Sequence, residues 1–193
     1  MGHDSKVPVV PGMRWAEIGR IAQYFLQHTY PELLREPGPF PVEEFIEFRM
    51  KKSSGTLGFK YAIQELPEGI EAAMDPREKL VILSPATYDN LADGIPRARF
   101  TGAHEIAHVI LHAKYLQHRI MDGGNLLRLN RGNIKPFRDP ECQANAFAAA
   151  LLMPTHHMVR MLDEGANVRS IAEIFQVSFE SAGYRVDGLD KYL

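Results

Sequence analysis

The sequence predicts an α+β fold in which a small sheet is followed by a helical half. Three short strand-like runs lie within residues 57–84, with turn signals between them. Most of the remaining chain repeats its apolar residues at the three- and four-residue spacing of helices. A length of 193 residues and a hydrophobic content of 45% suit one domain with a sizeable core.

The chain is expected to divide into a short arm and one domain. Residues 1–12 contain several prolines and glycines after Val7 and are predicted to be a flexible N-terminal arm. Residues 13–193 are predicted to form a single domain. Its N-terminal helices and sheet should occupy about residues 13–85, and its C-terminal helical part about residues 86–193.

Two helices and three strands are predicted in the N-terminal part. The helices are expected over Met13–His28, which has an apolar stripe, and over Val42–Arg49. Strands are expected over Leu57–Leu66, Ile70–Met74 and Lys79–Ser84. Because short turns separate the strands, we expect a small antiparallel meander.

The next helix, predicted over Arg97–Leu111, carries the most informative motif, His104-Glu-Ile-Ala-His108. Two histidines four residues apart stand one turn above each other on the same helix face and can share one zinc ion. Glu105 starts about 100° round the helix, so it can reach the open metal position without occupying it. This spacing predicts a zinc site with a carboxylate as general base.

The alternative is that the two imidazoles are hydrogen-bonded core histidines. A motif of this kind arises by chance in roughly one of forty chains of this composition. The helix, however, is apolar almost all round and is therefore predicted to be buried. Burying two histidines and a glutamate is costly without a metal or firm partners, so we favour the zinc site.

A catalytic zinc usually has a third protein ligand. Lys114 stands where a metzincin has its third histidine, which excludes that class. His112 continues the spacing, yet a third turn drifts away from the ion, and we expect it to be an outer-shell or surface residue. His118 and the pair His156–His157 remain possible ligands.

The favoured third ligand lies in a helix predicted over Asp139–Pro154. Asp139 is a natural N-cap, and Pro140 fits the first helical position. Glu141 and Asn145 then share one face, so Glu141 can bind zinc while Asn145 orients a metal-binding histidine. Alternatively, Glu141 only complements the helix dipole. Cys142 points about 100° away and is interpreted as a buried, inert thiol.

These stretches resemble the ImmA/IrrE metallopeptidases, which are gluzincin-like proteases. The resemblance rests on Arg99-Phe-Thr-Gly-Ala-His-Glu-Ile-Ala-His108, Glu141-Cys-Gln-Ala-Asn-Ala-Phe-Ala148 and Leu151-Leu-Met-Pro154. It implies a zincin-like core over residues 13–193. It also implies a helix-turn-helix transcriptional repressor or regulator as the protein substrate.

The resemblance further implies one zinc per chain, held by His104, His108 and Glu141, with Glu105 as catalytic base. Two features stand apart from the family pattern. Ala150 occupies a place where an acidic residue is common, and the segment between the second histidine and Glu141 is long. The link from Lys114 to Pro136 is expected to form a hairpin or an irregular flap, and the sequence does not tell the role of residues 114–138.

The C-terminal helices suggest a rival function. Helices are predicted after Pro154 to Glu164, over Val168–Phe175 and over Phe179–Leu189, and the last two have a helix-turn-helix rhythm. Residues 168–193 carry a net charge of −1, which argues against phosphate binding. A second rival is a non-catalytic, zinc-stabilised protein-binding module, although such a module needs no general base at Glu105.

Composition narrows the remaining possibilities. The net charge of −2 gives no reason to expect nucleic acid, and no apolar run is long enough to span a membrane. The N-terminal residues lack the charged and then apolar order of a signal peptide. A single cysteine excludes an intrachain disulfide and favours the reducing cytoplasm. We therefore predict a cytoplasmic zinc endopeptidase. The sequence does not identify the stabiliser of the oxyanion; the candidates are Tyr184, Arg185, His156 and His157.

Overall fold

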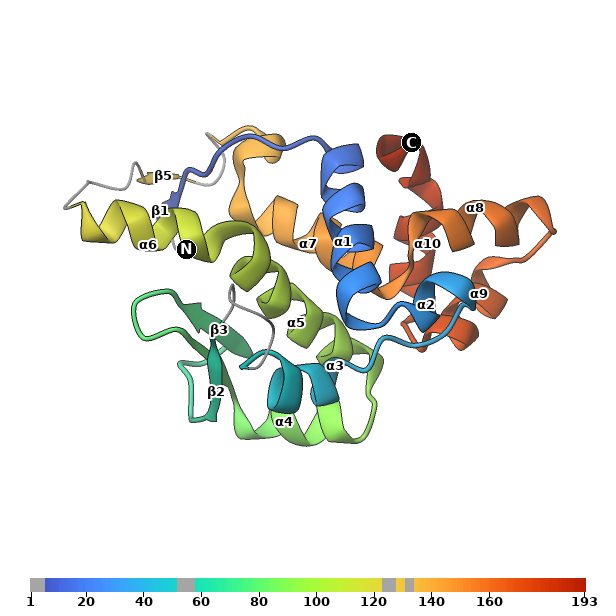
Figure 1. Cartoon of the computed structure of the whole chain (residues 1–193). Coiled ribbons are helices and arrows are strands. Elements are labelled where there is room, and N and C mark those ends of the chain that lie inside the picture. The colour runs from blue at the N-terminus through green and yellow to red at the C-terminus, as the bar shows by residue number, and fades with distance from the viewer. Residues whose placement is uncertain (1–5, 52–57, 123–127, 131–133) are drawn as a thin grey trace.

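The computed structural model describes residues 6–51, 58–122, 128–130 and 134–193 (Figure 1). Its strands are β1 (Lys6–Pro8), β2 (Lys60–Ile63), β3 (Ala72–Asp75), β4 (Leu80–Leu83) and β5 (Arg128–Asn130). The helices of the N-terminal half are α1 (Trp15–Thr29), α2 (Glu32–Arg35), α3 (Val42–Glu44), the π-helical turn η1 (Phe45–Arg49) and α4 (Pro85–Ala92). The later helices are α5 (Pro96–Ala107), the π-helical turn η2 (His108–His112), α6 (Ala113–Met121), the 3₁₀ turn η4 (Pro136–Arg138), α7 (Pro140–Leu152), α8 (Thr155–Asp163), α9 (Val168–Phe175), α10 (Phe179–Asp187) and the 3₁₀ turn η5 (Leu189–Tyr192).

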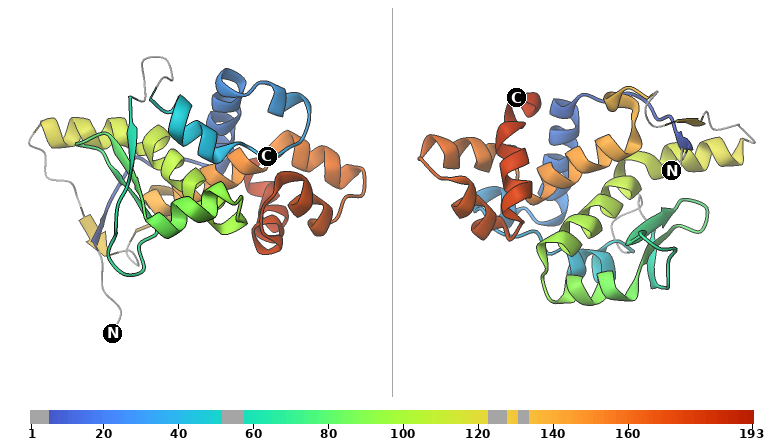
Figure 2. Two further views of the ribbon diagram at one scale, coloured as in Figure 1. Left: turned by 90° about the horizontal axis from the view of Figure 1, so that it is seen from below. Right: turned by 180° about the vertical axis from the view of Figure 1, so that it is seen from behind.

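The α+β class is confirmed, and one apolar core holds the helices together. Helix α7 packs against both α1 and α5. Ile18 of α1, Ile106 of α5 and Phe147 of α7 are fully buried in this core. The three-stranded sheet and the helices α8 to α10 lie at opposite ends of the molecule (Figures 1 and 2). The core thus fixes α5 against α7, the two helices that carry the predicted site residues.

The three-stranded sheet is mixed and not an antiparallel meander. Its order is β2-β4-β3, with β4 parallel to β2 and antiparallel to β3. Strand β4 takes the centre because it is the most apolar of the three, with Val81 and Leu83 fully buried. A tight turn joins β3 to β4, and the carboxylate of Asp75 accepts the backbone N–H groups of Arg77 and Glu78 there. The predicted strand start at Leu57 lies outside the described residues.

The helix with the two motif histidines is longer than the sequence predicts. Helix α5 runs through η2 into α6 and ends at Met121, ten residues beyond the predicted end. Residues 103–121 contain no glycine or proline, so nothing in the backbone chemistry stops the helix at Leu111. Part of the segment expected to be a hairpin or flap is therefore helical. Residues 123–127 and 131–133 lie outside the described part of the chain.

Residues 6–13, most of which lie in the predicted N-terminal arm, contact other segments of the chain. Strand β1 pairs antiparallel with β5, and Val9 and Val10 are buried. The backbone N–H of Val10 donates to the carbonyl of Arg138, and that of Met13 donates to the carbonyl of Phe137. Residues 6–13 thus lie against the segment that leads into α7. The first five residues of the predicted arm lie outside the described range.

Candidate metal centre

Helices α5 and α7 bring His104, His108 and Glu141 together. The Nε2 atoms of the two histidines are 3.0 Å apart. The carboxylate oxygens of Glu141 lie 3.3 Å from Nε2 of His104 and 3.4 Å from Nε2 of His108. Glu141 occupies the first turn of α7, where Asp139 caps the helix by accepting the backbone N–H of Glu141 at 2.9 Å. The three side chains form a possible metal site.

Asn145 determines which nitrogen of His104 faces this cluster. The Oδ1 atom of Asn145, one turn after Glu141 on α7, lies 2.8 Å from Nδ1 of His104. Because a carbonyl oxygen only accepts, Nδ1 of His104 carries the hydrogen. The lone pair of a neutral His104 is therefore on Nε2, which faces His108 and Glu141.

A longer chain of hydrogen bonds orients His108. Both hydrogens of the Gln143 amide are used, because its Nε2 donates to the carbonyls of Pro11 at 2.9 Å and Phe137 at 2.7 Å. Its Oε1 accepts from Nε2 of His112 at 2.9 Å. Nδ1 of His112 is then an acceptor, and Nδ1 of His108 donates to it at 3.0 Å. This leaves the lone pair of His108 on Nε2, facing the cluster.

The electrostatics of the cluster favour a positive charge at its centre. The adjacent imidazoles of His104 and His108 hold the pKa of the Glu141 carboxyl well below its usual range, against the opposing effect of burial. Burial lowers the pKa of His104, but the bond to Glu141 and the nearby carboxylates outweigh it and leave that pKa raised. Burial and the neighbouring His108 lower the pKa of His112 to about 3, so His112 is neutral at neutral pH.

The donor set suits zinc. Two imidazole nitrogens and one carboxylate oxygen are ligands that catalytic zinc sites use, with a further position open. Two lone pairs only 3.0 Å apart repel each other unless a cation lies between them or one ring is protonated. The side chains of His104, His108 and Glu141 are 16%, 13% and 32% exposed, so the cluster is accessible from solvent.

Glu105 lies beside the cluster on α5 and is 6% exposed. Burial raises the pKa of its carboxyl, and the opposing effects of His108 and His104 are smaller. A carboxylate with a raised pKa is a better proton acceptor at neutral pH. Cys142, the neighbour of Glu141, is not part of the cluster.

The other candidates from the sequence lie elsewhere. His118 is exposed on α6, whereas His112 is buried and acts on His108. His156 and His157 bond the carbonyls of Leu34 and Leu33.

The other two candidates for stabilising the oxyanion, Tyr184 and Arg185, differ in their surroundings. Arg185 donates to the carbonyl of Met153 and the hydroxyl of Thr155, and its guanidinium covers the Tyr192 ring. Three of the four candidates are thus engaged in holding other segments, and Tyr184 is 72% exposed.

The sequence analysis missed Gln143, which accepts a hydrogen bond from His112. The only signal of Gln143 in the sequence is a polar side chain within an alanine-rich helix.

The fold and the site together define an α+β protein with a possible metal site on two packed helices. Residues 93–187 match the peptidase-family model described as the IrrE N-terminal-like domain, and this part of the chain belongs to that family. The resemblance seen in the sequence is thereby confirmed. The matched region contains every residue of the cluster, whereas the three-stranded sheet lies before it.

A solved structure of a Mycobacterium tuberculosis transcriptional regulator has a similar fold, with a TM-score of 0.55 and 16% sequence identity. The similarity covers 87% of this chain but only 45% of that one, so this chain spans less than half of its length. No curated protein matches the chain. Within the described residues, no helix is long and apolar enough to cross a membrane.

Proposed function

We propose that this chain is a zinc-dependent endopeptidase that binds one zinc ion through His104, His108 and Glu141. The observation that supports it is the convergence of two imidazole lone pairs and a carboxylate, each held in place by its own hydrogen bonds or helix position. Zinc bound there supplies Lewis-acid chemistry, which polarises a carbonyl group and acidifies water.

The residues of the chain supply the proton transfers and the geometry. Glu105 accepts the proton of the attacking water and delivers it to the leaving amine. Its raised pKa fits both halves of that task, because the carboxyl must give the proton up as readily as it takes it. Asn145 and the pair His112–Gln143 hold the two histidine rings in the orientation that this arrangement requires.

The sheet offers a place for an extended peptide. Strand β3 is an edge strand that pairs with β4 alone among the described residues. Glu71, which precedes β3, ties it to α5 by bonding Thr101 at 3.0 Å and Arg97 at 2.5 Å. A peptide that adds to this edge would run beside the motif helix. We propose a helix-turn-helix repressor or regulator in the cytoplasm as the substrate, on the strength of the ImmA/IrrE resemblance.

The variant Glu105→Gln tests the enzyme proposal. Glutamine keeps the size of the side chain but cannot accept the proton, so zinc content should stay at one per chain while cleavage falls by at least about a hundredfold. Glu164→Gln, an exposed change at the end of α8, is the matched control. Full cleavage by Glu105→Gln with normal zinc would reject the mechanism. Loss of zinc would instead make Glu105 a structural residue.

A further inference from the structure

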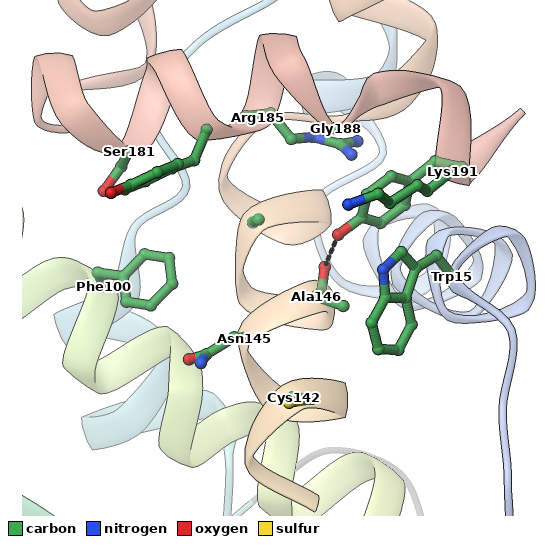
Figure 3. A pocket seen from close by; sticks show the side chains of 12 residues that line it. Trp15, Phe100, Cys142, Asn145, Ala146, Ser181, Arg185, Gly188 and Lys191 are labelled. Carbon is green, nitrogen blue, oxygen red and sulfur yellow. Dashed lines mark hydrogen bonds between the residues drawn. The ribbon is translucent and has the colours of Figure 1, made fainter. Parts of the chain in front are cut away.

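A groove of about 440 Å³ lies across one face of α7 (Figure 3). Its floor is made of Cys142, Ala146 and Ala149, which follow one another along the same face of that helix. Phe100 of α5 and Trp15 of α1 lie on opposite sides of α7 (Figure 3). Small side chains below and aromatic rings at the sides leave room for a ligand of the size that protein pockets usually take.

One residue, Asn145, connects the groove with the metal site. Asn145 lines the groove and also bonds His104. Phe100 is one helical turn before His104 on α5, and Cys142 directly follows Glu141. A peptide whose scissile bond lies at the cluster therefore has the groove beside it.

The chemistry of the groove favours an apolar occupant. Its lining surface is mostly apolar, and it includes the rings of Tyr184 and Tyr192. The charged side chains at the groove are Arg185 and Lys191, and none of the described residues that line it is acidic. Arg185 is already engaged with Met153 and with the Tyr192 ring. A large apolar side chain gains from burial here, whereas a lysine or arginine side chain meets like charge.

We propose that this groove binds a large apolar side chain of the substrate peptide, adjacent to the scissile bond. The inference rests on the proposed endopeptidase function and assigns the side-chain preference of that same site. Trp15 makes it testable without any cleavage, because it is the only tryptophan in the sequence and lines the groove.

The binding experiment uses Glu105→Gln loaded with zinc, so that peptides stay intact, and blocked hexapeptides that differ at one position. Peptides with Phe or Leu at the varied position should change Trp15 fluorescence at concentrations about tenfold below those needed for peptides with Gly or Lys at that position. Adding Ala149→Leu, which fills the floor at a partly exposed helical position, should abolish this difference. Adding Ala92→Leu, the same change at an exposed position of α4, should preserve it.

The cleavage experiment uses zinc-loaded protein with native Glu105 and a mixed peptide pool, and the cut sites are read by mass spectrometry. Large apolar residues should be enriched about tenfold at one position beside the cut, and Ala149→Leu should remove the enrichment while keeping its melting temperature. An unchanged cleavage pattern in Ala149→Leu, or tighter binding of the Gly or Lys peptides, would overturn the proposal. Selective Trp15 binding without any cleavage would overturn the protease function and support the groove's selectivity.

Discussion

Nε2 of His112 lies 2.9 Å from Oε1 of Gln143, and this contact joins the metal cluster to the N-terminal segment. Gln143 is fully buried and is held by the carbonyls of Pro11 and Phe137. The N-terminal segment therefore fixes the amide, the amide fixes the tautomer of His112, and His112 fixes that of His108. The ligand candidate His108 is thus three hydrogen bonds away from the backbone carbonyls that anchor the chain of bonds.

Replacing Gln143 with Leu should lower zinc affinity by about 10–100-fold, because His112 and His108 lose their fixed tautomers. A chelator competition measures this at a temperature where circular dichroism shows a folded protein. Gln27→Leu, an exposed change on α1, is the control. His112→Phe should have a similar effect, and the double variant should cost little more than either single one. Fully additive losses would show that the two residues act independently.

The sequence predicted those helices best whose ends carry local signals. Asp139 and Pro140 mark the start of α7, and Asn167 and Ser178 cap α9 and α10 as their residue types indicate. The order of the sheet was not predictable in the same way. Whether β2 pairs with β3 or with β4 depends on which strand the core buries most, and no local signal records that.

The metal cluster was predicted to the extent that spacing alone determines it. The structure brings His104, His108 and Glu141 together, while their roles with zinc stay predictions. The sequence offered His112 as an outer-shell or surface residue but did not predict its bond to Gln143, because the position of Gln143 depends on how the segment before α7 and the N-terminal residues meet. No pattern along the chain reports a contact between residues 11 and 143.

Glu141 and its neighbours should differ sharply in their effect on zinc binding. Glu141→Ala removes a ligand and should lower zinc affinity by more than about a hundredfold, whereas Asn145→Ala removes an outer-shell bond and should lower it by about 10–100-fold. Cys142→Ala should change it less than about threefold, because the thiol lies outside the cluster. Zinc content after dialysis, measured by elemental analysis, separates the three. A damaging Cys142→Ala would mean that the site is of another class.

Arg99 should contribute far more to stability than Arg97, although both are arginines near the start of the same helix. Arg99 is buried and donates to the carbonyls of Phe40 and Gln176 at 3.1 and 3.0 Å, which ties α5 to the end of α9. Arg99→Ala leaves these carbonyls unpaired and should lower the free energy of unfolding by about 2–4 kcal/mol. Arg97 is exposed beside Glu71, and Arg97→Ala should cost no more than about 1 kcal/mol. Urea denaturation of the two variants tests the difference, and equal losses would refute it.

His157 should make the fold less stable in acid. Its Nε2–H donates to the carbonyl of Leu33 at 2.8 Å, and its Nδ1 accepts from Arg160 at 3.3 Å, so the folded ring is neutral. Burial, together with His156 and Arg160, lowers its pKa below the ordinary histidine value of about 6.5. The unfolded chain therefore binds a proton that the folded chain does not, and the free energy of unfolding should fall as the pH drops below about 6.5.

His157→Gln isolates this contribution of His157, because glutamine can still donate to Leu33 but cannot be protonated. The variant should lose less stability than the unmodified protein between pH 7 and pH 5, by up to about 1.4 kcal/mol per pH unit. Urea denaturation at pH 7, 6 and 5, with a chelator present so that metal release does not contribute, gives both slopes. Because every other titrating group is shared, the difference between the slopes belongs to His157. Parallel slopes, or a steeper loss in His157→Gln, would show that the folded protein accepts a proton at this position.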